Sequence, residues 1–299
     1  MIETKKINLT GTMRLPFLAL APTYGFFGLS IAVWNQGQLD IVHAILVIIG
    51  IFAAQISVNV LNEYYDFKSG LDLKTERTPF SGGSGTLPQK PELARSTLIL
   101  GLAAFAITGV IGIFFAISRG LLLLPLGLLG MVMIYTYTIW VNRFPIPCLV
   151  APGLGFGVLI VVGTDFVLTG QYSWTALIAS LTTFFLASNL LLLNQFPDVD
   201  ADRSVGRRHL PIVTGKQKSA LVYIAFLALA YMPIIVGVLT RYLPVPSLLG
   251  LGTIILAVPT AVGVYRHATD TQKLIPFMGM NVALMLGTPV LMGVGFLIG

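Results

Sequence analysis

The chain has 299 residues, of which 56% are hydrophobic and only 10% are charged, and its mean hydropathy is +0.87. Soluble domains carry roughly 25% charged residues, so this composition excludes a soluble globular protein and predicts a polytopic membrane protein. The net charge of +6 is unevenly distributed, which indicates membrane orientation and anionic ligands rather than nucleic acid. The one cysteine, Cys148, excludes an internal disulfide and a cysteine-based metal site.

Nine segments are apolar over about the 20 residues that a helix needs to cross a bilayer. The predicted spans are residues 16–34, 41–65, 96–118, 120–140, 147–168, 174–196, 219–239, 246–265 and 274–298. They predict an all-α membrane bundle that forms one transmembrane domain over residues 1–299. Two long polar loops, 66–95 and 197–218, are expected to carry an active site. No cleavable signal peptide is apparent.

Lysine and arginine are distributed unevenly between the two ends of these segments. If the N-terminus is cytoplasmic, only Arg119 and Arg241 of the 18 lysines and arginines fall on the opposite side. Cytoplasmic loops of membrane proteins are enriched in these residues. The distribution predicts a plasma-membrane protein whose N-terminus and two long loops are cytoplasmic and whose C-terminus is on the outer side.

A polar cluster closes the second apolar segment. Asn59, Asn62 and Asp66 follow one another at spacings of three and four residues, so on a helix they share one face. A carboxylate at the C-terminal end of a membrane helix is unfavourable unless a cation balances it. The cluster therefore predicts a bound cation or cationic side chain at this helix end.

A second cluster of the same kind closes the sixth segment, about 130 residues later. Asn194 is followed by Asp198 and Asp202, which are one helical turn apart if helical geometry persists past Pro197. His209 is the one histidine or cysteine nearby at metal-ligand spacing, so zinc is not expected. Oxygen ligands suit Mg²⁺, which binds one or two carboxylates together with phosphate oxygens. The two helix ends predict one divalent metal site, and solvated loop acids are the alternative.

Three further acids near these clusters are expected to contribute unequally. Asp72 lies beyond Gly70, which leaves its helical register open, and it is a candidate metal ligand. Glu63 is expected to point to another side of the helix as a surface group. For Asp200, a metal ligand and a solvated loop residue are equally compatible with the sequence.

Basic residues follow each acidic cluster and predict a metal-bridged polyanion such as a diphosphate. The alternative for each is that membrane topology alone requires the charge. The candidate diphosphate-binding residues are the amides Asn59 and Asn194 and the cations Lys68, Arg77, Arg143, Arg203 and Arg207.

The stretch Phe80–Thr86 is rich in glycine, which suits a backbone anion site, although a flexible loop or lid is an equal alternative. Tyr135 and Tyr137 lie near the end of the fourth segment. A tyrosine there could stabilise a carbocation by cation–π attraction. The alternative is an ordinary aromatic belt at the membrane interface.

These motifs resemble a known family. Asn62-Glu63-Tyr64-Tyr65-Asp66 followed by Ser69-Gly70-Leu71-Asp72 resembles the first aspartate-rich motif of the UbiA superfamily of membrane prenyltransferases, and Asp198-x-x-x-Asp202 resembles the second. Their form is most similar to the 1,4-dihydroxy-2-naphthoate prenyltransferase branch of menaquinone synthesis. The commonest first motif has aspartate directly after asparagine, where this chain has Glu63.

The resemblance implies a helix bundle with a central cavity, a polar cytoplasmic mouth and an apolar body open to lipid. It implies transfer of a polyprenyl group from an allylic diphosphate to an aromatic acceptor, with two Mg²⁺ ions bridging the diphosphate. Asn62, Asp66, Asp72, Asp198 and Asp202 would be the metal ligands. Tyr135 would face the allylic cation, and the candidate cations named above would neutralise the leaving group.

Two alternatives stay open. A sister prenyltransferase would use 4-hydroxybenzoate, a chlorin or haem, or geranylgeranylglyceryl phosphate as its acceptor. A secondary transporter for a divalent cation or an anionic metabolite belongs to a different class. Transporters place ionisable residues near the bilayer midplane, whereas the acids here lie at helix ends, which favours the enzyme.

Overall fold

The computed structural model describes residues 8–299, so Lys5 and Lys6, which contribute to the orientation prediction, lie outside the described residues. Within residues 8–299 all regular elements are helices, and nine helical segments are long and apolar enough to cross a membrane. This confirms the predicted all-α membrane bundle.

The helix boundaries differ from the predicted ones by a few residues. The membrane helices are α1 (Leu20–Gln36), α2 (Ile41–Lys68), α4 (Ala94–Arg119), α5 (Leu124–Ile139), α6 (Pro145–Pro152) continued by α7 (Ile160–Thr169), α8 (Trp174–Asn194), α11 (Lys216–Leu239), α12 (Ile254–His267) and α13 (Thr271–Ile298). The predicted loops are partly helical, because they contain the short helices α3 (Thr86–Gln89), α9 (Val199–Ser204) and α10 (Leu210–Thr214).

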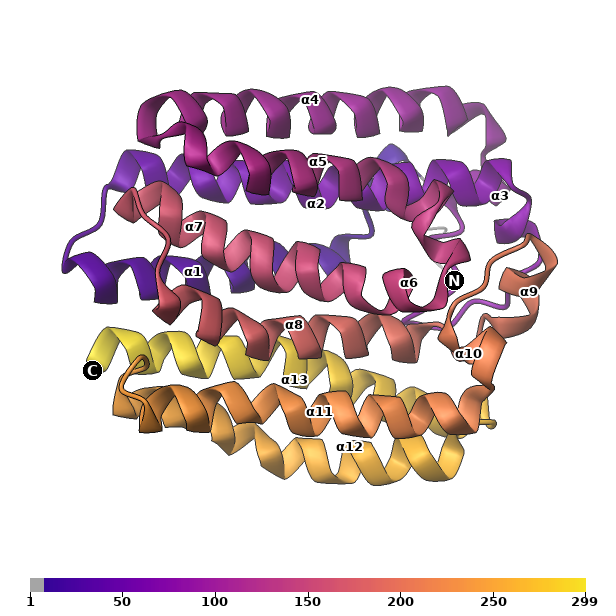
Figure 1. The fold of residues 1–299 in the computed structure, drawn as a ribbon. Helices are drawn as coiled ribbons and strands as arrows, with labels where there is room; N and C mark the ends of the chain where they lie inside the picture. Colours follow the sequence, from indigo (N-terminus) through magenta and orange to yellow (C-terminus); the bar gives the residue numbers. More distant parts are fainter. Residues whose placement is uncertain (1–7) are drawn as a thin grey trace, which may run out of the picture.

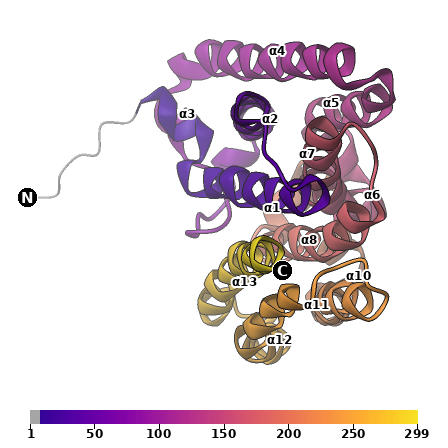
Figure 2. The ribbon, with the colours of Figure 1, turned by 90° about the vertical axis from the view of Figure 1, so that its left-hand side faces the viewer.

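The long helices lie side by side, and α3, α9 and α10 gather at the same end of the bundle (Figure 1). Viewed along the helices, α1, α2, α4, α5 and α7 are grouped on one side of α8, with α11, α12 and α13 on the other (Figure 2). The largest apolar core joins α8 to the second group through buried side chains such as Leu186, Leu227 and Leu284. The second group therefore packs tightly against α8.

The fifth membrane segment is irregular in its middle, where residues Gly153–Leu159 form a π-helical stretch between α6 and α7. Gly153 and Gly157 allow this stretch to contact α8 closely, since a Cβ atom on either would lie 2.4 Å from the backbone of Phe184. Insertions of this kind inside α-helices are frequent at functional sites.

A cavity of about 690 Å³ lies within the first group of helices. Its body is lined by apolar side chains and glycines of α2, α4, α5 and the fifth segment, for example Ile51, Gly112 and Met133. Most of its polar lining residues lie where α2 and α8 end, near the short helices, while Gln55, Thr108 and Thr164 line its apolar body. Together these walls form an apolar chamber with a polar head.

Candidate active site

The first half of the polar head comes from the end of α2. Gly70, just beyond the helix, has φ of 77°, a left-handed conformation that glycine adopts without steric cost and that commonly ends helices. Asn62 and Asp66 both line the cavity from one face of α2, as their spacing predicts. The Asn62 Nδ2 atom donates to Thr138 Oγ1 at 3.0 Å, which ties α2 to the end of α5.

The second half comes from the turn between α8 and α9. Pro197 interrupts the helix, yet the Asp202 backbone N–H donates to the carbonyl of Asp198 at 2.8 Å. A new helical turn therefore begins at Asp198 and places Asp198 and Asp202 one turn apart, and both aspartates line the cavity. Asp198 faces the hydroxyl of Ser81 and the backbone N–H of Gly82 from the glycine-rich stretch.

One guanidinium joins the two halves. Arg207 forms an ion pair with Asp66 through Nη2 and a second with Asp202 through Nη1, the latter at 2.8 Å. The other oxygen of Asp202 lies 2.7 Å from Nε2 of the buried His209. Burial lowers the pKa of Arg207, but Asp66 and Asp202 raise it more, so the net change is upward. Arg207 is thus a permanent cation between the two acidic clusters.

Glu63 is not the surface group that the sequence predicted. Its side chain is fully buried and accepts hydrogen bonds from the Arg14 Nε atom at 2.5 Å, the Ser84 amide at 2.8 Å and the Ser84 hydroxyl at 2.6 Å. The expectation was wrong because the N-terminal segment and the glycine-rich stretch cover this side of α2. Arg14 itself has φ of 52°, a costly conformation for a non-glycine residue that often marks functional sites.

The glycine-rich stretch is held against the acids. Gly82, Gly83 and Gly85 all have positive φ. A Cβ atom on Gly83 would lie 2.9 Å from Asp72 Oδ1 and 3.3 Å from Glu63 Oε1, so only glycine lets the backbone approach both carboxylates. The stretch therefore forms one wall of the polar head.

We expect Glu63→Gln to destabilise the protein by about 2 kcal/mol, because Arg14 would lose the carboxylate that balances its charge while most of the shape is kept. The measurement is thermal unfolding in detergent. Glu76→Gln, at an exposed residue, is the matched control and should leave the midpoint unchanged. An equal midpoint for E63Q and the wild type would contradict the role assigned to this contact.

Three buried oxygen atoms in the head have no hydrogen-bond partner, namely Asp72 Oδ2, Asp198 Oδ1 and Asn194 Oδ1. Burial raises the pKa of Asp72 to about 7, and the nearby Glu63 and Asp66 add to the rise. Burial likewise raises the pKa of Asp198 to about 7, with a further contribution from Asp202. A divalent cation would bind the unpartnered oxygens and balance the carboxylate charges that raise these pKa values. An all-oxygen donor set fits Mg²⁺.

The acids are not gathered around one point. In the part of the chain that the structure describes, no three acidic, histidine or cysteine side chains are placed to hold an ion together. Arg207 stands between Asp66 and Asp202. Metal binding would therefore require the carboxylates to exchange this guanidinium for the ion.

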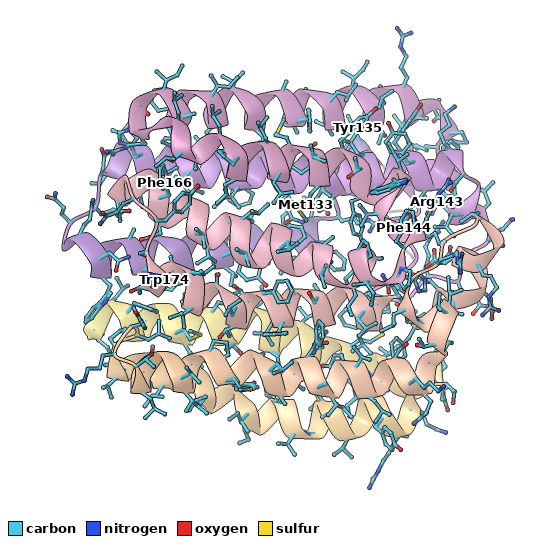
Figure 3. The ribbon with its side chains drawn as sticks, in the orientation of Figure 1. Met133, Tyr135, Arg143, Phe144, Phe166 and Trp174 are labelled. Carbon is cyan, nitrogen blue, oxygen red and sulfur yellow. The ribbon has the colours of Figure 1, made fainter. Side chains whose placement is uncertain are left out.

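Four of the predicted diphosphate-binding cations lie outside the cavity lining. Lys68, Arg77, Arg143 and Arg203 are all exposed. The Lys68 Nζ atom lies 5.9 Å from the centre of the Tyr64 ring, and Arg203 lies 3.5 Å from the exposed Asp200. Arg143 follows α5 near the end of the bundle that carries α9 (Figure 3). Of the predicted cations, the structure brings only Arg207 into the head.

Tyr135 does not line the cavity. It is 45% exposed on α5, and its ring packs against Phe105 of α4 with 6.3 Å between ring centres (Figure 3). Tyr137 lines the cavity instead. Residues two apart on a helix point about 200° apart, so only one of the two tyrosines can face inward.

The predicted amides Asn59 and Asn194 do line the cavity, while the lining residues Arg14, Gln55 and His209 were missed. Gln55 extends the series 55, 59, 62, 66 on one face of α2, and this periodicity is a signal that sequence inspection could have used. Arg14 and His209 carry no comparable signal, because their positions depend on segments distant in sequence.

Known proteins resemble this chain in sequence. A family model described as the UbiA prenyltransferase family matches residues 19–285. A protein of Bacillus subtilis named 1,4-dihydroxy-2-naphthoate octaprenyltransferase is 30% identical over 192 residues, which are 62% of this chain and 59% of that protein. A protein of Haemophilus influenzae with the same name is 24% identical over 100% of this chain and 98% of its own length.

Among solved structures, a UbiA homologue from Archaeoglobus fulgidus bound to DMAPP and Mg²⁺ superposes with a TM-score of 0.62. The match covers 97% of this chain and 99% of that one at 13% sequence identity. At this identity the similarity shows that the two chains share a fold.

Proposed function

This chain belongs to the UbiA prenyltransferase family, and from that premise we propose that it transfers a polyprenyl group from an allylic prenyl diphosphate to 1,4-dihydroxy-2-naphthoate. The protein is a prenyltransferase and an integral, multi-pass membrane protein. The names of its curated relatives support the naphthoate as acceptor. The observation that carries the proposal is the pair of buried acidic clusters at the head of an apolar cavity.

The two acidic clusters are the proposed binding site for a magnesium-bound diphosphate. Asn62 and Asp66 would act from α2, Asp198 and Asp202 from the turn at α9, and Asp72 from the loop between them. Two Mg²⁺ ions held by these residues would neutralise the charge of the leaving group. The unpartnered oxygens of Asp72 and Asp198 support this role, and so does the Mg²⁺ bound by the Archaeoglobus homologue.

Arg207 is the proposed direct contact to the diphosphate. Its guanidinium lies at the head of the cavity, and once Mg²⁺ replaces it between Asp66 and Asp202 its parallel N–H groups would be free to match phosphate oxygens in pairs. Asn59 and Asn194 line the same region. The exposed Lys68, Arg77, Arg143 and Arg203 would contribute a positive field at the mouth that attracts the diphosphate.

In the proposed reaction, the bond between the allylic carbon and the diphosphate oxygen breaks, and its electron pair leaves with the diphosphate. A ring carbon of the acceptor then uses a π electron pair to form the new carbon–carbon bond. The ring recovers its aromaticity by losing a proton or carbon dioxide. Tyr137 faces the cavity and is the proposed cation–π partner of the allylic cation, in place of Tyr135. The apolar walls exclude water, which would otherwise trap the cation.

We also propose that the polar head faces the cytoplasm. Arg119 is the last residue of α4 and Arg241 follows α11, both at the end of the bundle opposite α9 and α10 (Figure 1). The remaining lysines and arginines of residues 8–299 fall at or near the helix ends on the side of the polar head. This agrees with the enrichment of these cations in cytoplasmic loops.

The test is a turnover assay on the purified protein in detergent with labelled geranylgeranyl diphosphate, Mg²⁺ and 1,4-dihydroxy-2-naphthoate. A prenylated naphthoquinol formed with Mg²⁺ and absent with EDTA is the expected result. Transfer to 4-hydroxybenzoate but not to the naphthoate would overturn the proposed acceptor.

Mg²⁺ and inorganic diphosphate together should raise the thermal midpoint of the protein. A ligand at 100 times its Kd raises the free energy of unfolding by about 2.7 kcal/mol. The rise is expected here because the cation would balance the charge of the buried carboxylates. EDTA should abolish the rise, and Mg²⁺ or diphosphate alone should produce less than half of it. An equal midpoint with and without the pair of ligands would contradict the proposed site.

A further inference from the structure

A buried polar side chain lines the cavity below the proposed diphosphate site. Gln55 on α2 is 2% exposed and lines the cavity, and its Oε1 atom has no hydrogen-bond partner. It precedes Asn62 by seven residues, which is about 10 Å along a helix. Of its cavity-lining neighbours on α2, Ile51, Ala54 and Val58 are apolar, and Asn59 is polar. An acceptor atom left unpaired in such a place costs about 1–3 kcal/mol.

The orientation of the Gln55 amide is determined by a chain of hydrogen bonds. The carbonyl oxygen of Met13 can only accept, and it accepts from Asn59 Nδ2 at 2.9 Å. This places Asn59 Oδ1 toward Gln55, where it accepts from Gln55 Nε2 at 3.2 Å. The free group of Gln55 is therefore its carbonyl oxygen, and a ligand must supply a hydrogen-bond donor to satisfy it.

The prenyl diphosphate cannot supply that donor. Its tail is a hydrocarbon, and its charged end carries acceptor oxygens that we place at Asn62 and Asp66, nearer the mouth. The other proposed substrate class, a hydroxylated aromatic ring, has both a donor and flat apolar faces. Gln55 thus matches the acceptor and not the prenyl donor.

Resting on the proposed function, we propose that Gln55 Oε1 accepts a hydrogen bond from an aromatic hydroxyl of the acceptor, so that the ring lies against α2 between Gln55 and Asn62. The interval of about 10 Å accommodates this arrangement. The attacking ring carbon must lie about 3 Å from the allylic carbon, and the hydroxyl oxygen about 2.8 Å from Gln55 Oε1. These two distances leave room for one ring in the interval of about 10 Å. Gln55 is then a specificity-determining residue for the acceptor.

The test compares the binding of two probes, 4-hydroxy-2-naphthoate and 2-naphthoate, which differ by one hydroxyl that is too far from the carboxylate to donate to it. Binding is measured by thermal stabilisation with Mg²⁺ and inorganic diphosphate present. The wild type should bind the hydroxylated probe about five- to tenfold more tightly, the usual effect of one hydrogen bond. Gln55→Met keeps the length of the side chain, removes the carbonyl and should bind both probes equally.

Asn281→Leu is the matched control. Asn281 is a buried amide in α13 that accepts from the Tyr223 hydroxyl at 2.8 Å and does not line the cavity. It should lose stability and keep the wild-type preference. A preference that survives in Q55M, or one that is missing from the wild type, would overturn the proposal.

A kinetic measurement separates this inference from the proposed function. In Q55M the KM for 1,4-dihydroxy-2-naphthoate should rise about five- to tenfold, while the KM for the prenyl diphosphate stays unchanged. An equal rise in both KM values would overturn the role of Gln55. If the wild type prenylates no aromatic acceptor but Q55M still loses the preference between the probes, the site stands and the proposed reaction fails.

Discussion

Asp198→Asn is expected to reduce prenyl transfer by about 10³-fold while the protein remains folded. Asp198 is half-buried at the head of the cavity, its buried Oδ1 atom has no partner, and its pKa is raised to about 7. A neutral amide keeps the volume but removes a charge that the proposed metal–diphosphate complex needs. Loss of one such electrostatic contact commonly costs about 10²–10³ in rate, and loss of metal affinity adds to it.

The comparison for this variant is Asp200→Asn, two residues along the same helix. The Asp200 side chain is 94% exposed and meets only Arg203, at 3.5 Å, so D200N should keep the wild-type rate within about twofold. Initial rates at saturating Mg²⁺ and the thermal midpoint are measured for both. A D198N protein that is folded and retains a tenth of the wild-type rate would remove Asp198 from the proposed site.

Arg207→Gln is expected to lower both stability and activity. The substitution leaves Asp66 and Asp202 buried without their shared cation. Breaking a buried ion pair by removing one partner costs about 3–5 kcal/mol, so the thermal midpoint without metal should fall well below that of the wild type. Transfer should also fall by about 10²-fold or more, because the proposed diphosphate contact is lost.

Mg²⁺ gives this variant a distinctive signature. Without the guanidinium between the two carboxylates, the ion alone can neutralise them, so Mg²⁺ should raise the midpoint of R207Q more than that of the wild type. Arg203→Gln, at a side chain that is 58% exposed, should behave like the wild type in both measurements. A wild-type midpoint for R207Q, or an equal response to Mg²⁺, would refute the bridging role of Arg207.

The membrane architecture and the two acidic clusters could be predicted because the signals are local. Each span is a continuous apolar stretch, and a helix in lipid must satisfy its own backbone hydrogen bonds. The shared face of Asn62 and Asp66 follows from helical period alone. The turn from Asp198 to Asp202 likewise forms after Pro197, because the hydrogen bond that closes it does not involve the proline nitrogen.

The partners within the site could not be read in the same way. Arg207 is 141 residues from Asp66, and four other cations had equal claims in the sequence. Glu63 was predicted at the surface because it points away from the helix face that Asn62 and Asp66 share, but Arg14 and Ser84 enclose it. Tyr135 and Tyr137 are chemically identical, and only the packing of α5 against α4 separates them.

The sequence by itself therefore determined the fold class, the helices and the two helix ends that carry the acidic clusters, since composition and helical period act within one segment. The tertiary structure alone decided which charges pair and which side chains face the cavity. Those choices depend on burial, and a residue is buried by segments that its own sequence neighbourhood does not specify.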